Sequence, residues 1–179
     1  QGAEETEGPP VNWPRDYVVL ANARADKGWH LMLQVAAKLP RRQFLAIANQ
    51  SDRGAAMADV RRLGLENVTV VDRTGQMAQV YRAAKLVIVP SFSFVETFSR
   101  VVIEAGRLSR PVLMADSGNL SYLGKGTDLV LPEDPVAWAR RIERILSKPT
   151  QYRQAVEQSR AIADKYTAAS LFANLAKIP

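Results

Sequence analysis

The stretch from Leu86 to Leu120 constrains the fold most, because it passes through a strand, a turn, a helix and a second strand. An apolar run at Leu86 to Pro90 leads into a turn rich in serine and phenylalanine, and a helical pattern begins near Phe98. A second apolar run follows at Pro111 to Ala115. Two strands joined through a helix are expected to lie parallel in one sheet.

The same alternation of apolar runs and helical patterns extends over most of the chain. Further strands are expected at Tyr17 to Ala21, Gln43 to Ala48, Asn67 to Val71 and Asp128 to Leu131. Further helices are expected before Pro40 and at Arg53 to Leu63, Gln76 to Ala84, Pro135 to Leu146, Gln151 to Lys165 and Ala168 to Lys177. This pattern predicts an α/β fold, a Rossmann-like, doubly wound parallel sheet of about six strands followed by C-terminal helices. With a strand order of 3-2-1-4-5-6, the turns after the first and fourth strands meet across one crevice.

Composition narrows the classes of function. The chain has 179 residues, no cysteine and one histidine, so it has no disulfide framework, no thiolate metal site and no pair of imidazoles. Its formal net charge of +6 is spread along the chain, which favours anionic small molecules or an anionic membrane surface over nucleic acid as partners. No apolar run approaches the roughly 20 residues that span a bilayer. We therefore expect a cytoplasmic protein, with peripheral attachment to the inner face of the membrane as an option.

The chain divides into two parts. Residues 1–14 contain acidic residues, glycines and prolines without periodicity, so we expect a flexible linker there. Residues 15–179 are long enough to form one domain with its own core.

Two carboxylates eight positions apart indicate a ligand site in the central stretch. Glu96 lies in the turn and Glu104 in the helix, and the amides of Phe98, Ser99 and Arg100 are expected in the first helical turn. Helix starts carry unpaired N–H groups and positive potential, so they favour anions such as phosphate. The arrangement suits a ligand with hydroxyls at both ends and negative charge in the middle, such as a nucleotide sugar.

Two cations follow the first strand, Arg24 and Lys27, where they are expected to reach a diphosphate in the crevice. Each candidate also has a simpler interpretation: Arg24 and Lys27 as solvated loop charges, Glu104 as a surface residue, and Glu96 as an acid that complements the helix dipole. No G-x-G-x-x-G or P-loop motif is present, and no D-x-D pair is available for a divalent ion, so no metal is expected.

Taken together, these segments resemble the C-terminal, nucleotide-sugar-binding domain of the retaining glycosyltransferases of family four, also called group 1, which have the two-domain GT-B architecture. The matching pieces are ARADKGWHLML, NVTVVDRTGQMAQVYRAAKLVIVPS, ETFSRVVIEA with its E-x7-E spacing, RPVLMADSGN and LVLPEDPVAWARRIERIL. They occur in the family's order and cover Tyr17 to Leu146.

The resemblance implies roles for individual residues. Arg24 and Lys27 neutralise the leaving diphosphate, Glu96 contacts the hydroxyls of the transferred sugar, and Glu104 accepts from the ribose. The remaining implied donor contacts are the amides of Thr97, Phe98, Ser99, Arg100 and Val101 and, around the base, Asp72, Arg73, Thr74 and Met77. No cofactor or metal is implied. The implied partners are a nucleotide-sugar donor, an N-terminal Rossmann-like domain absent from this chain and a membrane-bound or lipid-linked acceptor, in cell-envelope polysaccharide synthesis.

The chain departs from the family's pattern at several positions. Thr97 and Ser99 flank Phe98 where the family has glycines, Ser109 stands at another usual glycine, and Ser121 replaces a usual acid. The spacing from Arg24 to Lys27 is also shorter than usual. Two alternatives therefore remain: a non-catalytic nucleotide-sugar-binding or interaction module, and a GT-B epimerase or phosphorylase, against which the E-x7-E and K-G pieces argue.

Overall fold

The computed structural model describes residues 16–94 and 96–166. The expected linker at residues 1–14 and the expected helix at Ala168 to Lys177 lie outside these ranges.

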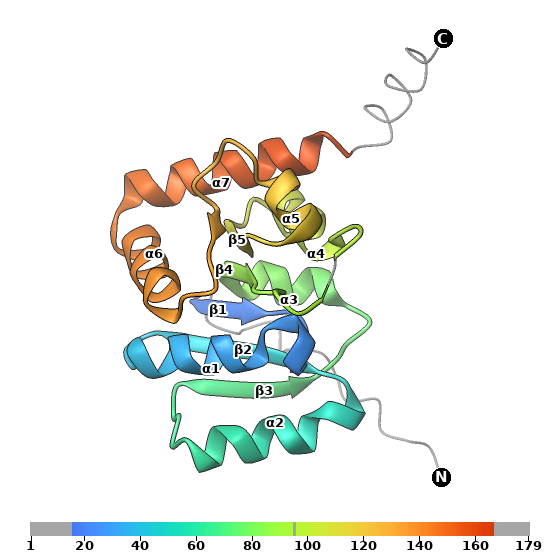
Figure 1. Cartoon of the computed structure of the whole chain (residues 1–179), viewed down its shortest axis with the longest axis vertical. Helices are drawn as coiled ribbons and strands as arrows, with labels where there is room; N and C mark the ends of the chain where they lie inside the picture. Colours follow the sequence, from blue (N-terminus) through green and yellow to red (C-terminus); the bar gives the residue numbers. More distant parts are fainter. Residues whose placement is uncertain (1–15, 95, 167–179) are drawn as a thin grey trace.

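A six-stranded parallel sheet forms the centre of the molecule, with the order β3-β2-β1-β4-β5-β6 (Figure 1). The strands are β1 (Tyr17–Leu20), β2 (Gln43–Ala48), β3 (Val68–Asp72), β4 (Ala84–Val89), β5 (Val112–Ala115) and β6 (Val130–Leu131). The predicted fold class is therefore confirmed, and the strand order is the one for which the turns after the first and fourth strands were expected to meet. The central strands are buried along almost their whole length, which explains why they read as continuous apolar runs.

Helices connect and cover the strands. They are the 3-10 turn η1 (Ala25–Lys27), α1 (Trp29–Lys38), α2 (Gln50–Arg62), α3 (Met77–Ala83), α4 (Arg100–Arg107), α5 (Gly118–Leu123), α6 (Pro135–Ser147) and α7 (Pro149–Asp164). Helix α2 packs against β2 and β3, while α3, α4 and α7 pack against β1, β4 and β5. From β1 to β3 the chain moves across the sheet in one direction, and from β4 to β6 it moves in the other. Because crossovers between parallel strands are right-handed, the helices of these two halves lie on opposite faces of the sheet.

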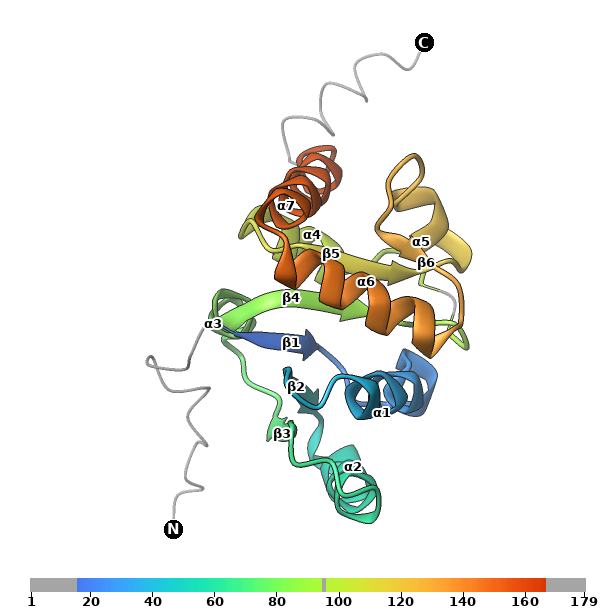
Figure 2. The same cartoon turned by 90° about the vertical axis from the view of Figure 1, so that its left-hand side faces the viewer.

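The two C-terminal helices return to pack on earlier ones. Helix α6 lies against α1, and α7 lies along α4. Asp134 is the N-cap of α6, and its side chain accepts from the Val136 amide at 2.8 Å. Figure 2 shows the arrowheads of β1, β4 and β5 pointing the same way, with α5 near the carboxyl end of β5.

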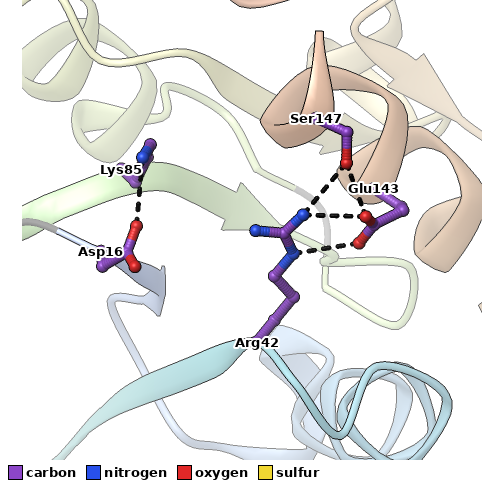
Figure 3. Close-up of polar contacts among 5 residues, drawn as sticks. All are labelled: Asp16, Arg42, Lys85, Glu143 and Ser147. Carbon is purple, nitrogen blue, oxygen red and sulfur yellow. Dashed lines mark hydrogen bonds and ion pairs between the residues drawn. The ribbon is translucent and has the colours of Figure 1, made fainter.

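Polar contacts tie the amino-terminal edge of the sheet together (Figure 3). Arg42, just before β2, donates to both carboxylate oxygens of Glu143 on α6 at 2.8 and 3.0 Å, and also to the Ser147 hydroxyl. The Arg42 guanidinium holds the pKa of Glu143 down at about 2, and Ser147 contributes to this effect. Lys85 on β4 pairs at 3.1 Å with Asp16, which directly precedes the neighbouring strand β1.

Three local features differ from the sequence-based expectation. Helix α4 begins at Arg100 with Ser99 as its N-cap, two residues later than predicted, because Ser99 has an extended backbone. Helix α5 was not predicted, and β6 has two residues where four were expected. Ser109, at a position where the family has glycine, has a φ of 56°, in the left-handed region that glycine occupies most easily.

Candidate functional site

The turns after β1 and β4 meet at the carboxyl edge of the sheet, as the strand order requires. Gly28, between η1 and α1, has a φ of 83° and lies directly against the end of β4. A Cβ atom at Gly28 would be 2.1 Å from the Pro90 carbonyl oxygen, so no other residue fits there without displacement. This close approach places Lys27 beside the turn that follows β4.

Lys27 and Glu96 form an ion pair across the two turns. The Lys27 Nζ lies 2.7 Å from Glu96 Oε1, and the two side chains are only 13% and 14% exposed. The buried Ser91 hydroxyl donates to the same carboxylate oxygen at 3.3 Å. The Lys27 ammonium also lies 3.1 Å from the centroid of the Phe94 ring, a cation–π contact.

A cavity of about 180 Å³ adjoins this ion pair. Its walls come from the ends of β1 and β4, from Lys27 and Glu96, and from the start of α4; they are Leu20, Ala21, Asn22, Lys27, Ile88, Val89, Ser91, Glu96, Phe98, Ser99, Arg100 and Val101. Six of the predicted site residues therefore surround one space. Because typical ligand sites enclose about 300–1,000 Å³, this cavity is large enough for only part of a nucleotide sugar.

The start of α4 forms one wall of the cavity. Ser99 is buried and serves as the N-cap, but its side chain does not accept a hydrogen bond from the first turn. A helix start without a side-chain cap offers its first amides, here those of Arg100 and Val101, to an anion. Thr97 is also held in place, because its carbonyl accepts from Asn119 on α5 at 2.9 Å.

Glu104 lies one turn further along α4, between a cation and a phenol. Arg100 donates to Glu104 Oε1 at 3.0 and 3.2 Å through two nitrogens. Burial raises the pKa of Tyr81 on α3, and Glu104 raises it further as a neighbouring charge and a hydrogen-bond acceptor, while Arg100 and Arg73 lower it. Glu104, Arg100 and Arg73 thus lie within electrostatic reach of the same phenol.

Arg24 does not line the cavity beside Lys27, contrary to the expectation that both face one crevice. Its guanidinium pairs with Asp26 at 2.7 Å. It lines a separate cavity of about 410 Å³ between the start of α1 and α2, together with Trp29 and Asp59. Asn22, two residues earlier, lines the cavity that contains Lys27.

The residues predicted to surround the base follow β3 at the same edge of the sheet. Asp72 and Arg73 line a cavity of about 520 Å³ that faces α2, and Asp72 pairs there with Arg53 at 3.3 Å. Thr74 accepts from the Gln76 amide at 3.1 Å, and Met77 begins α3. The structure brings this group to the correct edge but not into the cavity beside Lys27.

Besides apolar residues at the ends of β1 and β4, four polar or aromatic side chains at the site were not predicted: Asn22, Ser91, Phe94 and Asn119. Ser91 and Phe94 lie in the serine- and phenylalanine-rich turn, so the unusual composition of that turn was their only signal. Asn22 follows the apolar run of β1, and residues just after a parallel strand often lie at a ligand site, so its position was a signal.

Metal-binding and membrane-spanning features are absent from the part of the chain that the structure describes. Within residues 16–94 and 96–166, no three His, Asp or Glu side chains gather closely enough to bind a metal ion. In the same ranges, no helix has the length and apolar character that crossing a bilayer requires.

Known proteins resemble this chain in sequence. Residues 15–148 match the family described as "Glycosyl transferases group 1". A D-inositol 3-phosphate glycosyltransferase from Mycobacterium sp. (strain KMS) is 35% identical over 161 residues, which is 82% of this chain and 36% of that protein. The corresponding protein of Mycolicibacterium smegmatis is 33% identical over 145 residues, or 75% of this chain and 32% of that protein. The chain thus spans about a third of the length of these curated relatives.

Solved structures share the fold. Anabaena Alr3699/HepE in complex with UDP-glucose has a TM-score of 0.77 at 21% identity, covering 93% of this chain and 49% of that chain. Sucrose-phosphate synthase (tll1590) from Thermosynechococcus elongatus has a TM-score of 0.75 at 24% identity, covering 93% and 46%. The C-terminal domain of the group 1 family protein LpcC from Francisella tularensis has a TM-score of 0.69 at 15% identity, covering 86% of each. The family match, the sheet order and these neighbours agree, and the chain belongs to the group 1 glycosyltransferases, as a C-terminal domain of the GT-B type.

Proposed function

We propose that this chain is the donor-binding half of a retaining glycosyltransferase, which transfers a sugar from a nucleotide-diphosphate sugar to an acceptor hydroxyl without a metal ion. The observation that carries the proposal is the meeting of Lys27, Glu96 and the start of α4 around one cavity at the point where the strand order reverses. This arrangement offers a cation, a carboxylate and helix amides within one space.

Each group has a part in the proposed reaction. Lys27 and the first amides of α4 stabilise the charge that grows on the diphosphate as the glycosidic bond breaks. Glu96 accepts hydrogen bonds from the transferred sugar and Glu104 from the ribose, which fixes the donor for attack. Because Lys27 and the helix start supply the positive charge, no divalent ion is needed at the diphosphate.

The other partners belong to the same proposal. A second Rossmann-like domain would complete the cleft, since the cavity beside Lys27 is small for a whole donor. We further propose an acceptor at the inner face of the membrane, lipid-linked or otherwise membrane-bound, and a role in cell-envelope polysaccharide synthesis for the whole protein.

Calorimetry tests the proposal on this chain. UDP, GDP and ADP are titrated in EDTA, and one of them should bind the wild type and bind Lys27→Ala more weakly. Arg82→Ala is the matched control, because Arg82 lies in the last turn of α3, outside the residues that line the cavity. An absolute requirement for a divalent ion would refute the metal-free reaction, and no binding by any of the three nucleotides or by the corresponding nucleotide sugars would refute donor binding.

A non-catalytic nucleotide-sugar-binding module is the second candidate. It is favoured by the position of Arg24, which the structure places with Asp26 and away from the cavity, leaving Lys27 as the cation in the turn after β1 that faces it. A whole protein that binds the donor but transfers no sugar would support this second candidate.

A further inference from the structure

The ion pair between Lys27 and Glu96 restricts which ligands can bind to Lys27. The ammonium contacts Glu96 Oε1 at 2.7 Å and the Phe94 ring at 3.1 Å, so two of its sides are already occupied. A phosphate oxygen in ordinary contact with Lys27 then lies within about 6 Å of the Glu96 carboxylate. Because both side chains are largely buried, water screens the repulsion between these two anions only weakly.

The second ion pair leaves the side-chain charge of the site balanced. Arg100 lines the cavity and pairs with Glu104 on α4. Among the described residues named here, two cations therefore face two carboxylates. A bare diphosphate therefore meets a Lys27 whose charge is already balanced by the largely buried Glu96, while water screens the more exposed Arg100–Glu104 pair.

We propose that the Lys27–Glu96 pair makes this site select a nucleotide sugar over the nucleoside diphosphate that remains after transfer. This inference rests on the proposed function, in which Lys27 takes the diphosphate and Glu96 takes the sugar hydroxyls. A nucleotide sugar satisfies both partners, because its phosphate replaces Glu96 on Lys27 while its hydroxyls donate to Glu96. A nucleoside diphosphate satisfies only Lys27 and leaves a largely buried carboxylate with the Ser91 hydroxyl alone.

The consequence concerns product release. Once the sugar has left Glu96, the carboxylate regains its attraction for Lys27 and competes with the diphosphate for the ammonium. Re-forming the 2.7 Å pair thus favours departure of the spent nucleotide and restores the small cavity seen in the structure.

The test compares two affinities in each of four proteins. Calorimetry measures UDP against UDP-glucose, with GDP against GDP-mannose and ADP against ADP-glucose in parallel, on the 179-residue chain. The wild type should prefer the nucleotide sugar by about tenfold or more. Glu96→Gln should remove most of this preference by strengthening the binding of the bare nucleotide, since the amide is neutral but still accepts from a hydroxyl.

Two further variants keep the test specific. Glu157→Gln is the matched control, because Glu157 is exposed on α7, outside the residues that line the cavity, and its substitution should leave both affinities and their ratio unchanged. Ser91→Ala removes the remaining donor to Glu96, so it should increase the preference for the nucleotide sugar, in the direction opposite to Glu96→Gln. The melting temperature of each variant shows whether it is folded.

The outcomes separate the inference from the proposed function. An unchanged ratio in both Glu96→Gln and Ser91→Ala overturns the inference and leaves donor binding intact. No binding of any nucleotide or nucleotide sugar by the wild type overturns both. A ratio that falls in Glu96→Gln and rises in Ser91→Ala supports the inference.

Discussion

The contact between α4 and α7 should not tolerate even one added methyl group at Gly106. A Cβ atom there would lie 2.5 Å from the Ser159 carbonyl oxygen and 2.9 Å from the Ala163 Cβ atom. Carbon atoms pack best at about 3.5–4.0 Å, so the two helices would have to separate by most of an ångström. Overpacking of this kind typically lowers the free energy of unfolding by about 1–3 kcal/mol.

A second glycine provides the matched control for Gly106→Ala. Gly54 lies inside α2, and a Cβ atom built on it meets nothing within 4 Å. Gly54→Ala should therefore raise the free energy of unfolding by about 0.5–1 kcal/mol, through helix propensity alone. Both substitutions replace glycine by alanine in a helix, so they gain a similar amount from helix propensity. Subtracting one change in the free energy of unfolding from the other therefore leaves mainly the effect of the contact with α7.

Urea unfolding followed by far-UV circular dichroism measures both variants. We expect Gly106→Ala to be less stable than Gly54→Ala by about 1–3 kcal/mol, with unchanged m-values. Equal stabilisation by the two substitutions would refute the reasoning, since it would mean that α7 does not press on α4. The contact matters for the site because α4 carries Ser99 and Arg100 at its start.

Three further predictions follow from single side chains. Glu143→Gln should lower the melting temperature at pH 7, because the ion pair with Arg42 stabilises the folded state and depresses the pKa of Glu143. The stabilisation by this ion pair is present above the ordinary pKa of about 4.5 and is lost as the pH falls towards about 2. With 47% of the Glu143 side chain exposed we expect about 1 kcal/mol, and a difference between variant and wild type that persists at pH 2 would contradict the assignment. Glu104→Ala should weaken nucleotide binding by about 1–3 kcal/mol with little change in melting temperature; lost stability with intact affinity would make Glu104 structural. In the whole protein, Lys27→Ala should lower kcat by about 100- to 1,000-fold and change KM by a smaller factor, while Arg24→Ala should lower kcat far less. A change in KM alone would mean that Lys27 binds the donor equally well in the ground state and in the transition state.

The strands were predictable because the apolar pattern that marks each strand lies within the strand's own residues. Buried parallel strands are apolar on both faces, so the sequence predicts β2 with its exact bounds, Gln43–Ala48, and the five other strands to within two residues at each end. Helix α5 was missed for the opposite reason. It has only six residues and includes Asn119 and Ser121, which is too short and too polar to show a helical period.

The meeting of Lys27 and Glu96 was also predictable, although the two residues are 69 positions apart. The order of parallel strands determines which turns adjoin, and the order 3-2-1-4-5-6, considered as a condition from the sequence, is the one that the structure has. Arg24 lines a different cavity from Lys27, and the sequence pattern does not contain the local detail that decides this. Arg24 has extended backbone just before η1, and Asp26, two residues later, holds its guanidinium.

The charge of the whole chain says little about the charge of the site. The net charge of +6 suggests a protein that attracts anions, yet Lys27 and Arg100 at the cavity are each paired with a carboxylate. Attraction for a diphosphate must then come from the unpaired amides at the start of α4, which carry about half a positive charge, and from whatever releases the two cations. Under the function proposed above, recognition of the anion is therefore coupled to recognition of the hydroxyls beside it, because hydroxyls that donate to Glu96 release Lys27 for the phosphate.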